Sequence, residues 1–166
     1  MISIADYELQ FNKNENVYYV HSLENGAICP ICNRSLTRKG WPLRKVIMGD
    51  GEKQKFKVQR YYCKACNKTH RGLFDVIVPY KRHCAETIEG IVCKTALYPY
   101  CEDSTIRRIK AWWIVMQLYI KSVLVAIRER YGIDLTKEKK LIKIVRALVN
   151  THLWPGTRSA LTPGKT

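Results

Sequence analysis

Two pairs of cysteines with the same internal spacing constrain this chain more than any other feature. They are Cys29-Pro30-Ile31-Cys32 and Cys63-Lys64-Ala65-Cys66. Two residues between cysteines allow a tight turn, here called a knuckle, that directs both sulfurs to one ion. Asn33 and Asn67 each follow a knuckle directly, where tolerance of positive φ is useful. We therefore predict one structural zinc ion in a closed tetrahedral site, held by Cys29, Cys32, Cys63 and Cys66.

The two pairs are separated by 30 residues, more than the roughly 15–20 of common zinc ribbons. Residues 43–48 and 55–62 resemble strands, and Gly49-Asp50-Gly51 between them indicates a turn. The resulting hairpin explains the extra length, because both arms leave and return to the end where the knuckles meet. The alternative is a redox-active or fortuitous pair, but a redox motif needs only one pair in a βαβ setting. A catalytic zinc is disfavoured because four thiolates leave no position for water.

The other cysteines and histidines show no metal-binding spacing. We expect Cys84, Cys93 and Cys101 to be small apolar side chains of the core. His70 lies four residues after Cys66 and could replace a ligand. With four thiolates available, we expect it instead in a loop or in contact with phosphate.

The charge balance points to a polyanionic partner. The net charge is +15, and residues 34–82 alone carry 14 basic and three acidic residues. Nucleic acid is the first candidate and an anionic membrane surface the second. The seven cysteines, without a recognisable secretory signal, favour a reduced, cytoplasmic setting. We expect no membrane span, because the apolar window 111–127 contains Gln117, Lys121 and Ser122.

The expected fold class is α+β, with a small zinc β-ribbon followed by an α-helical, helix-turn-helix-like bundle. We expect residues 1–80 to form the ribbon domain, with one N-terminal strand at 17–21. Residues 81–150 are expected to form the helical domain, and residues 151–166 a tail. Residues 73–78 are a further strand candidate. In residues 55–62, alternation puts Phe56, Val58, Arg60 and Tyr62 on one face.

Apolar spacing predicts a helix near residues 84–94, a long helix ending at Gly132, and a last helix within 132–150. The buried stripe of the long helix consists of Ile106, Ile109, Trp113, Met116, Ile120, Val123 or Leu124, Ile127 and Tyr131. Asp134 or Thr136 could cap the last helix. Residues 97–101 form either a short helix or a turn.

The long helix begins like a DNA recognition helix. Asp103 or Ser104 can cap it, and basic residues follow in its first turns, where groove-entering helices contact base edges. The alternative is an ordinary amphipathic helix with a solvated basic face. Predicted contacts on this helix are Ser104, Thr105, Arg107, Arg108 and Lys110. Predicted phosphate contacts outside it are Lys55, Lys57, Arg60, Lys64, Lys68, Arg71, Lys81 and Arg82.

The chain also resembles an uncharacterised bacterial family with an N-terminal zinc ribbon and a helix-turn-helix-like region, similar to the DNA-binding front ends of insertion-sequence transposases. The segments that carry the resemblance are 24–32, 60–70, Val78-Pro79-Tyr80-Lys81-Arg82, Ser104-Thr105-Ile106-Arg107-Arg108 and the end of the chain from 148 to 160. The family pattern has an aromatic residue at the position of Ile109. The resemblance implies DNA binding near mobile elements, and it implies no particular enzymatic reaction.

These observations predict a non-enzymatic, zinc-dependent protein that binds double-stranded DNA, as an accessory or regulator of a mobile element or as a transcription regulator. A transposase or another mobile-element protein is a candidate partner, and no small-molecule substrate is expected. The alternatives are a protein-interaction adaptor, an RNA-binding zinc protein and, less favoured, a compact transposase fragment. Strand transfer requires carboxylates that converge on Mg²⁺. The available acids, Asp75, Glu102, Asp103, Asp134 and Glu138, fall in turns or caps.

Overall fold

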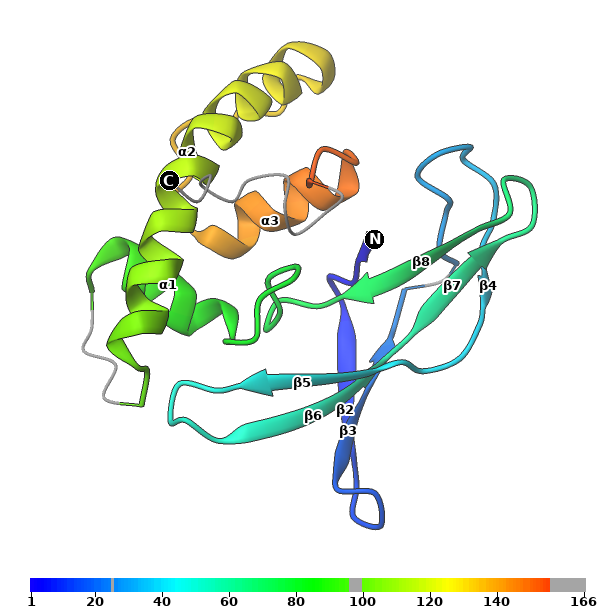
Figure 1. Cartoon of the computed structure of the whole chain (residues 1–166). Helices are drawn as coiled ribbons and strands as arrows, with labels where there is room; N and C mark the ends of the chain where they lie inside the picture. Colours follow the sequence, from blue (N-terminus) through cyan, green and yellow to red (C-terminus); the bar gives the residue numbers. More distant parts are fainter. Residues whose placement is uncertain (25, 96–99, 156–166) are drawn as a thin grey trace.

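The computed structural model describes residues 1–24, 26–95 and 100–155. It contains two small four-stranded sheets, followed in the sequence by three helices. Figure 1 shows the sheets at one end of the molecule and the helices gathered at the other. The expected α+β class, with a β-rich cysteine region before a helical region, is confirmed.

The first sheet carries the second cysteine pair. Its strands, in spatial order, are β1 (Ile2–Ser3), β8 (Lys68–Leu73), β7 (Arg60–Cys63) and β4 (Thr37–Arg38). β1 lies parallel to β8, whereas the β8–β7 and β7–β4 pairs are antiparallel. Gly72 allows this arrangement, because a Cβ there would lie 2.7 Å from both the Gln59 carbonyl oxygen and Cδ1 of Ile4.

The second sheet contains the predicted hairpin. Its order is β2 (Tyr7–Asn12), β3 (Val17–Ser22), β6 (Lys53–Val58) and β5 (Leu43–Ile47), with β3 and β6 parallel. β5 and β6 pair antiparallel around the predicted turn, in which Gly51 has φ 87° and Asp50 Oδ1 accepts the Glu52 N–H at 2.9 Å. The hairpin prediction and the strand at 17–21 are therefore confirmed.

Other strand predictions were wrong. Strand β2 was not predicted, although apolar and polar residues alternate along it; it is mostly exposed and depends on pairing with β3. The predicted strand at 55–62 divides at Gln59, whose side-chain amide donates to the carbonyls of Gly40 and Arg60. Val58 and Gln59 are both buried, so alternation reverses and Tyr61 faces inward. Residues 74–78 form a buried turn after β8, closed by Ile77 N–H to the Phe74 carbonyl at 3.0 Å.

The three helices are α1 (Ala85–Cys93), α2 (Asp103–Tyr131) and α3 (Leu141–Asn150). α2 ends at Gly132 as predicted, with φ 69°. Its N-cap is Glu102, not Asp103 or Ser104.

The start of α3 also differs from the prediction. Its N-cap is Lys140, and Asp134 instead accepts hydrogen bonds from Thr136 in the preceding loop. The N–H of Leu141 donates to Glu89 of α1 at 2.8 Å, so a carboxylate from another helix provides the cap that the local sequence lacks.

The connection between α1 and α2 spans nine residues, 94–102. A helix-turn-helix motif joins its helices by three or four residues. The described structure therefore does not contain the tight turn of that motif. The predicted short helix or turn at 97–101 lies largely outside the described residues.

One buried cluster extends from the sheets into the helices. It includes Phe56 and Phe74 from the β-region and Ile88, Met116 and Leu148 from the three helices. The predicted stripe of α2 is confirmed from Ile109 to Ile127, whereas Tyr131 is 48% exposed. Whether the β-region and the helices are separate domains stays a prediction.

Polar contacts also join the two ends of the molecule. The Tyr7 hydroxyl of β2 donates to Asp75, and Arg146 of α3 pairs with the same carboxylate at 3.4 Å. Burial and the bond to Asp75 raise the pKa of Tyr7 to about 12, so it stays a neutral donor at physiological pH. The backbone N–H of Ser3 donates to Asn150 Oδ1 at 3.3 Å. These bonds hold α3 against the β-region.

Among the described residues, α2 is the one helix long and apolar enough to cross a membrane by length and composition. Its most apolar window has a mean hydropathy of 1.3, with 28% of that window buried in the fold. Core helices of soluble proteins pass the same criterion. The partly buried window does leave apolar side chains on the outer face of α2, including Ile114 and Leu118.

Candidate metal centre and basic surface

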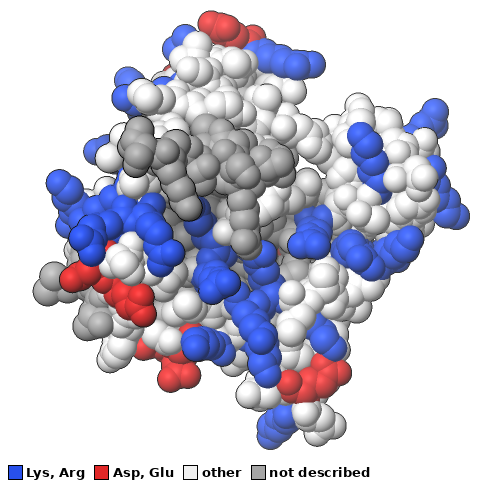
Figure 2. All heavy atoms as spheres, in the orientation of Figure 1, with Lys and Arg blue, Asp and Glu red and all other residues white. Residues whose placement is uncertain are grey.

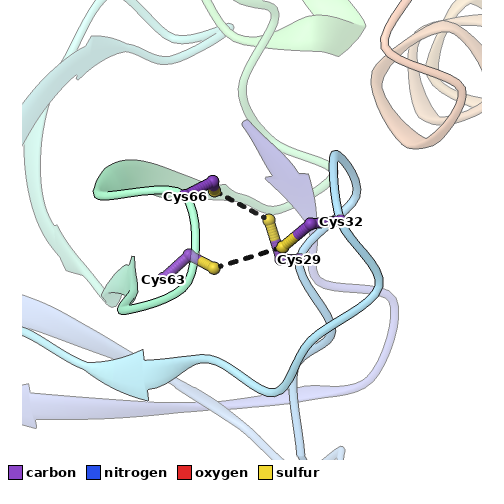
Figure 3. Close-up of side chains that lie close together, drawn as sticks. All are labelled: Cys29, Cys32, Cys63 and Cys66. Atoms are coloured by element: carbon purple, nitrogen blue, oxygen red, sulfur yellow. Dashed lines mark hydrogen bonds between the residues drawn. The ribbon is translucent and has the colours of Figure 1, made fainter.

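The four cysteines of the two knuckles come together as predicted (Figure 3). All four sulfurs lie within 4.8 Å of one another. The Sγ atoms of Cys29 and Cys66 are 3.6 Å apart, and those of Cys32 and Cys63 are 3.5 Å apart. Tetrahedral zinc with Zn–S bonds of about 2.3 Å requires sulfur separations of about 3.8 Å. The cluster could therefore hold one metal ion, and its four-sulfur donor set suits zinc.

Local backbone structure builds both knuckles. In the first, the Cys29 N–H donates to the Arg34 carbonyl at 2.7 Å, and Asn33 N–H donates to the Cys29 carbonyl at 2.8 Å. The second is the turn between β7 and β8, where Asn67 accepts a hydrogen bond from the Tyr62 hydroxyl at 2.8 Å. Asn33 and Asn67 have φ of 55° and 53°, which confirms the expected left-handed conformation.

The thiols of the cluster differ in how readily they ionise. Burial acts to raise the pKa of Cys29, but hydrogen bonds from the backbone N–H groups of Ile31 and Cys32 outweigh it and bring the pKa to about 7. Burial and the neighbouring thiols raise the pKa of Cys66 to about 12. One thiolate therefore disfavours the next, and a divalent ion is the species that allows four of them together.

His70 has a different place from the one predicted. It is a buried residue of β8, 4% exposed, and not a loop or phosphate-contacting residue. Its Nε2 lies 3.5 Å from the Cys29 sulfur. Burial lowers the pKa of His70, so the ring is neutral and one N–H can donate to a Cys29 thiolate. With a metal ion in the cluster, His70 would therefore be an outer partner of the Cys29 ligand.

Replacing His70 by phenylalanine is expected to retain metal binding but to lower the affinity for the metal. Loss of an outer-shell partner costs about 10–100-fold in metal affinity, and the aromatic ring maintains the packing against Tyr61. Zinc affinity can be measured by competition with a chromogenic chelator. An unchanged affinity would remove His70 from the site, whereas complete loss of zinc would make it a ligand in its own right.

Comparison with known proteins finds one family model that matches part of the chain. Residues 29–109 match the family model described as "Domain of unknown function (DUF6431)". The DUF6431 match begins at the first knuckle cysteine and ends at Ile109, in the second turn of α2. It therefore contains all four candidate ligands, the β5–β6 hairpin and α1. No curated protein and no solved structure matches the chain.

Four of the predicted phosphate contacts lie on β7, β8 and the turn between them, whereas Lys55 and Lys57 belong to β6 of the other sheet. Lys64 belongs to the second knuckle, Lys68 begins β8, and both are exposed. Arg60 of β7 lies directly opposite Arg71 of β8 in the antiparallel register. Arg60 also donates through Nε to the Lys39 carbonyl at 2.9 Å. Two positive side chains thus face each other across neighbouring strands of the DUF6431 segment.

The predicted contacts of the helical region form a second group. Arg107, Arg108 and Lys110 are exposed on the first turns of α2. Arg108 folds back along the helix, with Nε 3.3 Å from the Ser104 carbonyl and Nη2 3.0 Å from the Thr105 hydroxyl.

Lys81 and Arg82 lie on the connection between the two groups, and Lys81 Nζ is 3.8 Å above the Trp112 ring. The proposed roles of these residues in DNA binding stay predictions.

On the β5–β6 hairpin, sequence reasoning identified Lys55 and Lys57 as phosphate contacts but missed Lys45 and Lys53. Lys45 of β5 lies directly opposite Lys55 of β6, and Lys53 shares their face by alternation. In the sequence, the alternation of lysine with other residues from 53 to 57 was the available signal. The residues of β5 that lie opposite this segment could not be identified without the register of the hairpin.

The carboxylates proposed for a metal-dependent enzyme do not meet. Asp75 is bonded to Tyr7 and Arg146, and Glu138 accepts the backbone N–H groups of Lys139 and Lys140. In the part of the chain that the structure describes, the cysteine cluster is the one grouping of three or more His, Cys, Asp or Glu residues suited to a metal.

Proposed function

We propose that this chain is a non-enzymatic, zinc-dependent protein that binds double-stranded DNA. The observation that carries the proposal is that two pairs of like charge lie directly opposite in the strand register, Arg60 with Arg71 and Lys45 with Lys55. The zinc ion would act structurally by holding β7 and β8, and with them the basic residues of the DUF6431 segment.

Like charges directly opposite on neighbouring strands destabilise a sheet. A fold that retains two such pairs gains from a partner that offsets them, and a phosphate backbone does so. Within the described ranges, Lys57 is paired with Glu15, whereas Lys45, Lys53 and Lys55 have no carboxylate partner. Figure 2 shows basic side chains over much of one face of the molecule, with acidic side chains in a few separate groups.

The start of α2 is the proposed base-contacting element. A helix N-terminus favours negative charge, and the Ser104 and Thr105 hydroxyls lie there with the basic residues that follow. The resemblance to transposase front ends suggests a mobile-element accessory or regulator, with a transposase as candidate partner. A role as transcription regulator fits the same contacts.

Two single substitutions test the base-contacting role. Arg108 is held against the first turn by Ser104 and Thr105, so we propose that it contacts bases while Arg107 contacts phosphate. Arg108→Ala is expected to flatten sequence preference at one or two base pairs, at about 1–3 kcal/mol of discrimination. Arg107→Ala should weaken all sequences alike. In a binding-site selection, wild-type preference in both variants would make this helix a packing element.

A protein-interaction adaptor is the second candidate function. The outer face of α2 supports it, because Ile114 and Leu118 are 65% and 69% exposed. A salt titration on duplex DNA, single-stranded DNA and RNA separates the classes. Steep salt dependence on duplex supports the proposal, preference for RNA supports the RNA-binding alternative, and no affinity for any of them supports the adaptor.

A further inference from the structure

An open groove lies on the β2-β3-β6-β5 sheet, beside the lysines of the β5–β6 hairpin. It has a volume of about 480 Å³, and the rings of Tyr19, His21 and Trp41 lie along it. The Phe11 ring lies beside Tyr18, on the core side of the sheet. We infer that this groove binds an unpaired nucleobase of a single-stranded nucleic acid. The inference rests on the proposed nucleic-acid binding and adds a ligand that duplex binding does not require.

The rings are arranged as a stacking platform. The Trp41 centroid lies 4.9 Å from that of His21 and 5.3 Å from that of Tyr19, with interplanar angles of 63° and 70°. Tyr19 and His21 lie nearly parallel to each other, at 21°. Trp41 therefore meets both of the other rings edge to face, and the three form one aromatic cluster beside the groove. A nucleobase offers a flat π-face that stacks on such rings whatever its sequence.

These rings are not part of the core. Tyr18 of β3 stacks on buried Phe56, so the core lies on that side of the sheet. Tyr19 and His21 alternate with Tyr18 and therefore face the other side. Neither Tyr19 nor Trp41 packs against the buried cluster. Nε2 of His21 is buried with no hydrogen-bond partner among the described residues, so packing alone does not account for the arrangement.

Positive charge surrounds the platform. Tyr19 is the register partner of Lys57, so Lys53, Lys55 and the opposing Lys45 share its face, at steps of roughly 7 Å along the strand. Lys57 lies 4.9 Å from the Tyr19 centroid and is paired with Glu15, so it steadies the ring. The remaining lysines can follow the phosphates of a strand whose base occupies the groove.

Polar side chains make the groove specific for an unpaired base. Gln10 and Asn14 line it, and an amide offers both a donor and an acceptor to a base edge. Asn12 also lines it, but its Oδ1 accepts the backbone N–H groups of Asn14 and Glu15. In a duplex, neighbouring bases cover the ring faces and the partner strand covers the pairing edges. The combination of rings and amides therefore fits a base that is neither stacked nor paired.

The test compares the full chain with Trp41→Ala on two probes of equal charge. One is an oligothymidylate of about twelve nucleotides, and the other has the same sugar-phosphate chain without bases; a matching RNA and a duplex complete the set. The wild type should bind the base-containing strand about tenfold more tightly than the abasic one. Trp41→Ala should lose this preference while duplex affinity stays within about twofold, and Trp41→Phe should retain most of it.

Tyr131→Ala removes an exposed aromatic ring at the far end of α2 and serves as the matched control. If Trp41→Ala loses the preference for bases on the DNA strand, the RNA strand or both, the groove is the binding site for the base. The strand affected then identifies the ligand. If the wild type binds abasic and base-containing strands equally, the inference about the groove is wrong but the proposed function still stands. Failure to bind any of these polyanions overturns the proposed function as well. Zinc content and melting temperature, measured on every variant, show whether the fold is retained.

Discussion

Replacing Cys29 or Cys63 by serine is expected to reduce bound zinc from one ion per chain to nearly none and to unfold the cysteine region. Both sulfurs are fully buried, and each knuckle supplies two of the four donors. Apparent binding energies of structural zinc reach about 10–16 kcal/mol, and this energy is available only to the folded state. Metal analysis of freshly reduced protein and near-ultraviolet circular dichroism measure the two effects.

Cys93→Ser is the matched control, because Cys93 is the exposed cysteine at the end of α1. It should leave zinc content and melting temperature unchanged. Wild-type protein that contains no zinc when isolated under reducing conditions would contradict the metal assignment. If serine variants lose zinc but keep the wild-type dichroism, hydrophobic contacts around Tyr61 and His70 would suffice to hold the sheet.

The knuckles and the buried stripe of α2 could be predicted because their determinants are local. The backbone conformation of a Cys-x-x-Cys turn followed by asparagine is determined by those residues themselves. Asn33 and Asn67 adopt the positive φ that this turn requires. The apolar spacing of α2 identifies its buried face from Ile109 to Ile127 without knowledge of any partner. Cys93 was predicted to lie in the core but is exposed. A single small side chain carries no periodic signal from which its burial could be predicted.

Features that depend on distant partners could not be predicted. The β7 face reverses at Gln59 because its amide meets the Gly40 carbonyl, 19 residues earlier. The helix α3 begins at Leu141 because Glu89 of α1 accepts its first N–H, although Asp134 and Thr136 looked like better caps. The Trp41 platform likewise exists only when the loop before β5 is placed over β3.

Duplex affinity is expected to fall about a thousandfold or more as salt rises from about 50 to about 200 mM. That drop corresponds to roughly six phosphate contacts, a number that the basic residues around the knuckles and the start of α2 can supply. Arg71→Gln should reduce the slope of log K against log salt by about one. It should also leave stability unchanged or raise it slightly, because it removes the like charge opposite Arg60. Fluorescence anisotropy over a salt series and thermal unfolding measure both effects.

Lys139→Gln is the matched control, since Lys139 is exposed in the loop before α3, away from the proposed contacts. It removes the same charge from the chain, so a general effect of net charge would change its slope as much as that of Arg71→Gln. Equal slopes in the two variants would show that DNA responds to total charge alone and would deny the β7–β8 surface a specific role. A reduced slope in Arg71→Gln alone, together with undiminished stability, would show that this arginine pair is retained for phosphate binding at the expense of the sheet.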